Sequence, residues 1–185
     1  EKNGNLFGLI NNAGIQHRSP ILDFTTADFE HVLSTNLTSC FSLSREAIRF
    51  MSNSGGGRII NTVSMLGPQA RPTVPAYIDS KEGLRALTRA LAVEVGQKGI
   101  LVNAIAPGYI ATELNVALLE NKGFSDWVIS KTPLGRWGNP IELGGGAQGH
   151  PQTGPISSKS EPKFSDLAVG YKPTQYRVSR LNARV

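Results

Sequence analysis

Three short, nearly continuous apolar runs occur in the first 106 residues, and each is bounded by polar, glycine or proline turns. The first covers about 6–10 and is followed by the turn 11–14, Asn-Asn-Ala-Gly. The second covers about 58–63, after a run of glycines, and the third covers about 101–106, before Pro107 and Gly108. Apolar runs of this length between turn residues are typical of buried strands. The pattern therefore predicts three strands.

The stretches between and after these runs have the period of amphipathic helices. One begins near Thr25 or Thr26, which are candidate N-caps, and continues to about residue 51. The second stretch, 74–95, carries apolar residues at helical spacing, at Leu84, Leu87, Leu91 and Val95. A third helical stretch, in one or two pieces, is expected within 112–131.

Strands that alternate with helices of this length predict an α/β fold. We expect part of a doubly wound parallel sheet of the Rossmann type, covered by helices on both faces, with the strands 6–10, 58–63 and 101–106 in that order. In such sheets, ligands bind beyond the carboxyl ends of the strands. The turns that follow the three predicted strands lie at those ends, so we expect them to converge on one site.

The character of the chain changes near residue 146. The segment 147–185 is rich in Gly, Pro, Ser and Lys and has no clear period, so we expect an irregular or disordered tail. Residues 1–146 are expected to form the folded domain. Residues 150–185 contain six Lys or Arg against two acidic residues, which gives +4 of the net charge of +5. A sparse basic tail without aromatic or motif support does not indicate nucleic-acid binding.

Composition narrows the class of protein further. The 185 residues, 39% hydrophobic and 18% charged, correspond to about one globular domain. No apolar run reaches the ~18 residues of a membrane span, and the polar start does not resemble a secretory leader. Cys40 is the only cysteine, which excludes a disulfide framework and favours the cytoplasm. Three scattered histidines without a Cys/His cluster give no metal site.

A candidate reaction centre combines Ser64, at the end of the second strand, with Tyr77 and Lys81. Tyr77 and Lys81 are four residues apart, so they lie on one face of a helix. A free tyrosine has a pKa near ~10, and a neighbouring ammonium lowers it, so that the phenol can exchange a proton with an alcohol or carbonyl. Ser64 could stabilise charge on the reacting oxygen. The pair alone could equally be two exposed residues of an ordinary helix.

Five features follow one another in order between roughly residues 5 and 144. They are Asn11-Asn12-Ala13-Gly14, Asn36, Ser64, Tyr77 with Lys81, and Pro107-Gly108. Their order and spacing resemble one family, the short-chain dehydrogenase/reductases. The stretches 11–20, 108–115 and 132–140 are similar to its gluconate 5-dehydrogenase branch and to the 2-deoxy-gluconate 3-dehydrogenases.

The resemblance implies catalytic roles for four residues. Tyr77 would be the acid/base, and Lys81 would lower its pKa and hold the nicotinamide ribose. Ser64 would steady the substrate oxygen, and Asn36 would help to relay protons to water. The implied reaction is NAD(P)-dependent oxidation of a secondary alcohol, by a family-like homo-oligomer.

The resemblance also implies a set of cofactor contacts, with NAD or NADP as the cofactor. Taken alone, several of these residues have simpler interpretations: Asn12 as a strand-end turn, Thr112 as a helix N-cap, and Gly14 and Gly108 as turn glycines. The implied contacts are Asn12, Ala13, Gly14, Tyr77, Lys81, Pro107, Gly108, Ile110 and Thr112.

The substrate is expected to be a sugar acid. His17 and Arg18 follow the cofactor-contacting turn, and an arginine suits bidentate binding of a carboxylate. Arg18 could also be a solvated surface residue, and His17 a structural residue or a hydroxyl contact. A 3-oxoacyl carrier-protein reductase-like enzyme is the alternative within the class.

The chain departs from the family pattern at both ends. It contains no Thr-Gly-x-x-x-Gly-x-Gly turn of the kind that holds a pyrophosphate at a helix N-terminus, nor the segment that selects NAD or NADP. The final family strand is also without a counterpart. We therefore expect a truncated chain that binds its cofactor weakly. The alternative from another class is an inactive remnant that acts as a partner-binding module.

Overall fold

A three-stranded parallel sheet organises the part of the chain that the computed structural model describes, residues 6–143. Its strands are β1 (Gly8–Asn11), β2 (Gly57–Thr62) and β3 (Ile100–Ile105), in the order β1-β2-β3. In register, Ile10 pairs with Ile60, which pairs with Asn103. The predicted α/β class, parallel direction and strand order are confirmed.

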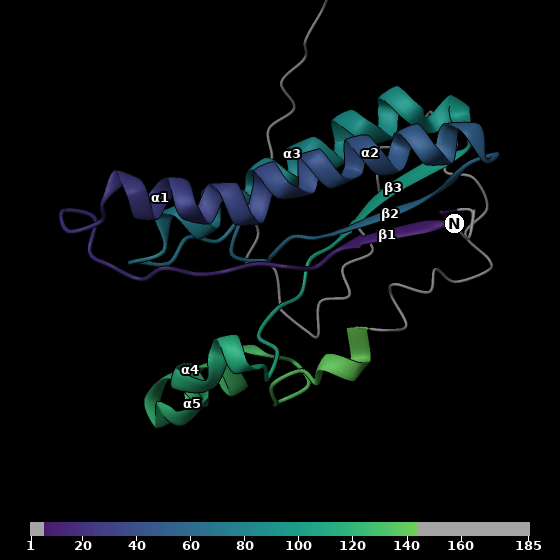
Figure 1. Cartoon of the computed structure of the whole chain (residues 1–185). Coiled ribbons are helices and arrows are strands. Elements are labelled where there is room, and N and C mark those ends of the chain that lie inside the picture. Colours follow the sequence, from purple (N-terminus) through teal and green to yellow (C-terminus); the bar gives the residue numbers. More distant parts are fainter. Residues whose placement is uncertain (1–5, 144–185) are drawn as a thin grey trace, which may run out of the picture.

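One layer of helices covers one face of this sheet (Figure 1). It consists of α1 (Thr26–Leu33), α2 (Ser39–Asn53) and α3 (Pro75–Val95). Thr25 is the N-cap of α1, as expected, and its Oγ1 accepts a hydrogen bond from the backbone N–H of Asp28. The last turn of α3 continues as a 3₁₀ turn that ends at Gly99, whose φ of 72° suits a residue without a Cβ.

A π-helical turn, Ser34–Thr38, joins α1 to α2. Such turns have i→i+5 hydrogen bonds and are rare, and they occur often at functional sites. The fully buried residue of this one is Asn36. The turn therefore separates two regular helices at the position of a predicted site residue.

The core lies between this helical layer and the sheet. Met51, Ile59 and Ile100 are fully buried, and they pack with Val95 and Val102 in one cluster. Each such side chain contributes roughly 1.5–3 kcal/mol of transfer free energy. The predicted apolar stripe of the long helix faces this core, because Leu84, Leu91 and Val95 are buried and Leu87 is partly buried.

The opposite face of the sheet is open in the described part of the chain. Ile10 and Leu101 are 58% and 46% exposed, although both lie within strands of the sheet. We expected helices on both faces. After β3, however, the chain turns away from the sheet at Pro107 and forms a separate small lobe, so no helix between residues 6 and 143 crosses this face (Figure 1).

The small lobe contains two short helices, α4 (Val116–Glu120) and α5 (Lys122–Lys131). The predicted helical stretch thus forms two pieces, because Asn121 interrupts it and caps α5 by accepting a hydrogen bond from Phe124 N at 3.0 Å. Aromatic edge contacts hold the lobe together, around Tyr109, Phe124, Trp127 and Trp137. The predicted irregular tail, 147–185, lies outside the described residues.

Candidate active site

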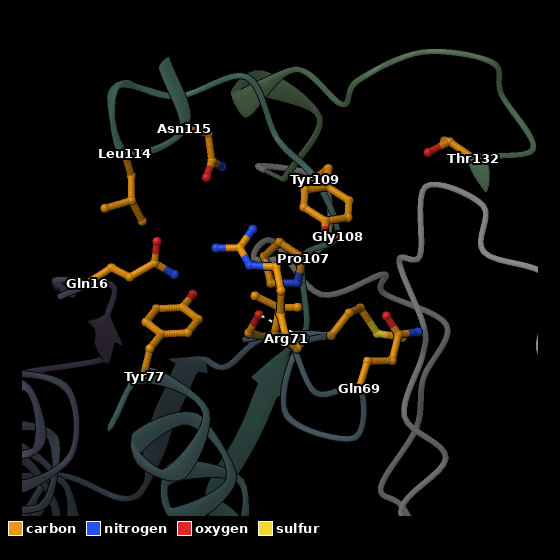
Figure 2. Close-up of a pocket in the computed structure, with 13 residues that line it drawn as sticks. Gln16, Gln69, Arg71, Tyr77, Pro107, Gly108, Tyr109, Leu114, Asn115 and Thr132 are labelled. Atoms are coloured by element: carbon orange, nitrogen blue, oxygen red, sulfur yellow. Dashed lines mark hydrogen bonds between the residues drawn. The ribbon is translucent and has the colours of Figure 1, made fainter. Parts of the chain in front are cut away.

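A cavity of about 80 Å³ lies between the carboxyl ends of the strands and the small lobe (Figure 2). Since a single water needs roughly 10–15 Å³ by this measure, the cavity is large enough for part of a small organic ligand. Its lining comes from four places: the turn after β1 (Gln16), the loop after β2 (Ser64, Arg71), the start of α3 (Tyr77) and the segment after β3 (Pro107). The expected convergence of strand ends on one site is therefore found.

Ser64 and Tyr77 meet at this cavity through a hydrogen bond between their side chains. Ser64 is 7% exposed, and its Oγ also accepts a hydrogen bond from Leu66 N at 3.1 Å. The side chain of Ser64 is therefore fixed by the loop that carries it. Figure 2 shows the hydroxyl end of Tyr77 pointing into the cavity.

The environment of Tyr77 favours the neutral phenol. Burial raises the pKa of Tyr77 above its ordinary value, while the hydrogen bond from Ser64 and the positive charge of Arg71 act in the opposite direction. Arg71 is thus the cation that acts on this phenol in the structure, although sequence reasoning did not identify it. A contribution of Lys81 to the pKa of Tyr77 stays a prediction.

Lys81 is 4% exposed and lies one helical turn after Tyr77. Its Nζ donates a hydrogen bond to the carbonyl of Thr62, at the end of β2, at 2.7 Å. Burial lowers the pKa of Lys81. Its ammonium group makes no other hydrogen bond with a residue between 6 and 143, so two of its three N–H donors remain for a ligand.

Asn36 fixes the turn that follows β1. Its Oδ1 accepts a hydrogen bond from Ile15 N at 2.8 Å, and its Nδ2 donates to Ile15 O at 2.9 Å and to Ser80 Oγ at 3.1 Å. Asn36 therefore holds this turn against α3. Its proposed role in proton relay stays a prediction.

The predicted cofactor residues after β1 are exposed at the edge of the site. Asn12, Ala13 and Gly14 are all accessible, and Asn12 Oδ1 accepts a hydrogen bond from Thr62 Oγ1 at 3.1 Å. A Cβ on Gly14 would lie 3.4 Å from the Nζ of Lys81. The missing side chain at Gly14 therefore leaves the space above the lysine ammonium open.

The predicted cofactor residues after β3 divide into two groups. Pro107 and Gly108 line the cavity. Ile110 is 5% exposed and forms an isolated bridge with Gly138, and Thr112 precedes a 3₁₀ turn without capping it through its side chain. Neither Ile110 nor Thr112 lines the cavity.

Of the three predicted substrate residues, Ser64 lines the cavity, whereas His17 and Arg18 do not. Arg18 is exposed, and its Nε donates a hydrogen bond to Gln16 Oε1 at 2.8 Å. His17 packs edge-on against Phe24 and places Nε2 3.7 Å from a carboxylate oxygen of Asp28.

Sequence reasoning missed nine of the thirteen lining residues, among them Gln16, Arg71, Tyr109 and Asn115. Gln16 and Arg71 had a usable signal, because both lie in segments that follow predicted strands. Tyr109 and Asn115 depend on how the small lobe folds over the site, which no local pattern indicates. Among residues 6–143, no three His, Cys, Asp or Glu side chains gather in a way that could hold a metal ion. No helix in the same range is long and apolar enough to cross a membrane.

The geometry agrees with the result of comparing the chain with known proteins. A family model described as short chain dehydrogenase matches residues 1–123. The chain belongs to the short-chain dehydrogenase family. The family that the resemblance indicated is therefore confirmed.

The proteins similar to this chain include enzymes named for gluconate and its keto derivative. The chain is 40% identical to gluconate 5-dehydrogenase of Gluconobacter oxydans over 139 residues, which is 75% of this chain and 54% of that protein. It is 41% identical to 5-keto-D-gluconate 5-reductase of Escherichia coli, over 75% of this chain and 55% of that protein. The chain therefore spans about half the length of the relatives it matches.

A solved structure supports the same comparison. It is a gluconate 5-dehydrogenase from Burkholderia cenocepacia in complex with NADP and tartrate. The TM-score is 0.76 at 40% identity, covering 79% of this chain and 57% of that chain. The three-stranded sheet and its helices thus have the arrangement found in a dehydrogenase of this family.

Proposed function

We propose that this chain carries the catalytic residues of an NAD(P)-dependent oxidoreductase that acts on a secondary alcohol of a sugar acid. The observation that carries the proposal is the hydrogen-bonded pair Ser64–Tyr77 in a cavity at the carboxyl edge of the sheet, with Lys81 one turn away on α3. The sugar-acid relatives support the substrate class.

The residues around Lys81 fit the nicotinamide-ribose part of NAD or NADP. The buried ammonium has two donors to spare for ribose hydroxyls, and the open space at Gly14 gives access to it. Pro107 and Gly108 would lie along the nicotinamide. When bound, the cofactor supplies the acceptor or donor of the hydride. The remaining chemistry concerns the proton on the substrate oxygen.

Tyr77 would exchange that proton. Because burial raises its pKa, Tyr77 is a neutral phenol at neutral pH and is ready to donate a proton to a carbonyl oxygen. In the oxidation direction, Tyr77 must first lose its proton, so this direction is favoured by higher pH. Ser64 would hydrogen-bond the substrate oxygen, and Asn36 would take part in the return of the proton to water.

The chain would also associate with a second copy of itself and act in the cytoplasm. Phe41 and Phe50 on α2 and Val93 on α3 are exposed apolar residues, and they support association of this chain with a second copy. Cys40, the single cysteine, is buried and free, which supports a cytoplasmic location. Sedimentation of the purified chain tests the association.

The test of function is NAD(P)H absorbance on mixing the chain with gluconate and cofactor. The 185 residues lack the glycine-rich pyrophosphate turn, so the assay is run with and without an added amino-terminal half from a relative. We expect turnover with the added half, and its loss in Tyr77→Phe with cofactor binding retained. Undiminished turnover by Tyr77→Phe would reject the assignment. Binding of the added half without any turnover would favour the partner-binding alternative.

A further inference from the structure

The lining of the cavity carries a positive charge and no negative charge. Of the thirteen residues that line it, Arg71 is the one that carries a formal charge at neutral pH, and none is Asp or Glu. Figure 2 shows its guanidinium group in the space between Gln16, Tyr77 and Tyr109. The cavity is therefore suited to an anion.

Arg71 has no hydrogen bond or ion pair with any residue of the described range 6–143. The contact that positions it is the ring of Phe124, whose centre lies 5.8 Å from its Cζ. Several other arginines in this range do have an acidic partner: Arg49 pairs with Glu46 at 2.8 Å and Arg136 with Glu142 at 2.6 Å. Arg71 is half-buried, so its five N–H donors are available to water or to a ligand, and their place in the cavity beside Tyr77 points to an anionic partner.

The loop that carries Arg71 is held in one conformation by its contacts and by its backbone. Ser19 N donates a hydrogen bond to Thr73 O at 3.0 Å, which ties the segment after β1 to the loop before α3. Thr73 has a φ of 70°, an unusual value for a β-branched residue that is expected to store strain. Pro72 restricts the backbone of Arg71 itself to extended conformations. These constraints present the side chain of Arg71 to the cavity.

Arg18 is the other arginine that could bind an anion here, but it does not line the cavity. It is exposed beside the cavity, and its Nε is engaged with Gln16, which does line the cavity. Partial burial and the charge of Arg71 both lower the pKa of Arg18, so the two guanidinium groups are close enough to repel. An anion bound at Arg71 would relieve this repulsion, while Arg18 contacts the site through Gln16.

We propose that Arg71 binds the carboxylate of the substrate by a bidentate contact beside Tyr77, and that Arg18 is a positioning residue that orients Gln16. This rests on the proposed function for the identity of the acid, whereas the anion site itself does not depend on turnover. A planar guanidinium matches a carboxylate at two points, which a lysine at the same position would not reproduce. The site then selects acids over neutral polyols of equal length.

The experiment measures binding without cofactor. The isotope-labelled 185-residue chain is titrated with gluconate and, separately, with sorbitol, which has an alcohol in place of the carboxylate. The indole N–H signals of Trp127 and Trp137 report binding in NMR spectra, since both rings contact Tyr109 of the cavity. Arg71→Gln, Arg71→Lys and Arg18→Gln are compared, and far-ultraviolet circular dichroism verifies that each variant is folded.

We expect the chain to bind gluconate more tightly than sorbitol. Arg71→Gln should weaken gluconate binding about 10- to 100-fold and leave sorbitol unchanged, since a hydrogen bond to a charged group is lost. Arg71→Lys should recover only part of the preference. Arg18→Gln should weaken both ligands by a similar, smaller factor, because it acts through Gln16. Raised salt should weaken gluconate binding alone.

Two outcomes would overturn the inference: equal binding of gluconate and sorbitol by the unaltered chain, or loss of the preference in Arg18→Gln with its retention in Arg71→Gln. Either result leaves the proton-transfer role of Tyr77 untouched, because that role is tested by turnover. Conversely, an Arg71-dependent preference in a chain that shows no turnover even with the added amino-terminal half would support the anion site and count against the proposed function.

Discussion

The ammonium group of Lys81 lies 5.7 Å from the centre of the Tyr77 ring, and it donates its hydrogen bond to the carbonyl of Thr62 at 2.7 Å. The two side chains thus share a helix face, as their spacing predicts, while the lysine is directed to the end of β2. The charge that acts on the phenol comes instead from Arg71, on the loop before α3.

Tyr77 should make stability depend on pH in the alkaline range. Its folded-state pKa is raised above the ordinary value of 10.0, mainly by burial. The neutral phenol is therefore favoured in the folded protein, and its contribution is fully present below about pH 10 and is lost as pH rises through the folded-state pKa. We expect Tyr77→Phe to flatten this alkaline decrease in the free energy of unfolding, measured by urea denaturation at a series of pH values. An unchanged slope in the variant would contradict the buried position of the phenol.

Glu142 should show the opposite dependence, confined to acid. Arg136 Nη2 donates to Glu142 at 2.6 Å and Asn139 N donates to it at the same distance, and these bonds lower the pKa of Glu142 to about 2. The contribution of this exposed group is present above its ordinary value of 4.5 and is lost as pH falls through about 2. We expect an NMR titration of its carboxyl carbon to give a pKa clearly below 4.5, and Arg136→Ala to restore the ordinary value. A midpoint near 4.5 in the unaltered chain would show that the pair does not form in solution.

A matched pair of glycines tests the junction between β2 and β3. Gly55 and Gly56 have φ of 84° and 112°, so alanine at either position is strained by roughly 1–2 kcal/mol. A Cβ at Gly55 meets open space, whereas one at Gly56 would collide with the carbonyl oxygen of Gly99. We expect Gly56→Ala to lower the free energy of unfolding clearly more than Gly55→Ala, in thermal or urea denaturation. Equal losses would mean that the two turns do not approach as described.

Buried amides join β1, β2 and α3, and their loss should be costly. Asn11 Nδ2 donates to Asn61 Oδ1 at 2.7 Å, and Asn61 Nδ2 donates to Thr88 Oγ1 at 2.9 Å. Asn61→Ala leaves buried donors and acceptors unpaired, so we expect a loss of about 1–3 kcal/mol in urea denaturation. Asn103→Ala, on the exposed face of β3, is the control and should cost far less. Similar losses for both variants would argue against this network.

The sequence was enough to predict the strands and helices that short-range patterns specify. The strands and α3 were predictable because apolar runs, leucine spacing and the stops at Gly96 and Gly99 are short-range signals. Ser64 and Tyr77 were placed together correctly, since the carboxyl ends of parallel strands must share one edge of the sheet.

Other features depended on contacts between distant segments. The partner of Lys81 is a backbone carbonyl 19 positions away, and no side-chain pattern encodes it. Arg71 was missed although it follows a predicted strand, because the sequence of an irregular loop does not show where each side chain points. The hydrogen bond from Ser19 N to Thr73 O that holds this loop joins two distant segments. Within residues 6–143, the expectation of helices on both faces of the sheet was wrong. Two right-handed crossovers that run in one direction along β1-β2-β3 place their helices on the same face, and the chain after β3 forms the small lobe instead of a helix on the other face.

The π-helical turn at Ser34–Thr38 determines how α2 is rotated about its axis relative to α1. Buried residues follow one another at intervals of four across it, from Val32 through Asn36 to Cys40 and Ser44. A regular α-helix has 3.6 residues per turn, so removing one residue from the turn would rotate α2 by about 100° relative to α1. Asn36 and the apolar face of α2 cannot both keep their places after such a deletion. This short segment should therefore accept exchanges of side chain far more readily than any change in length.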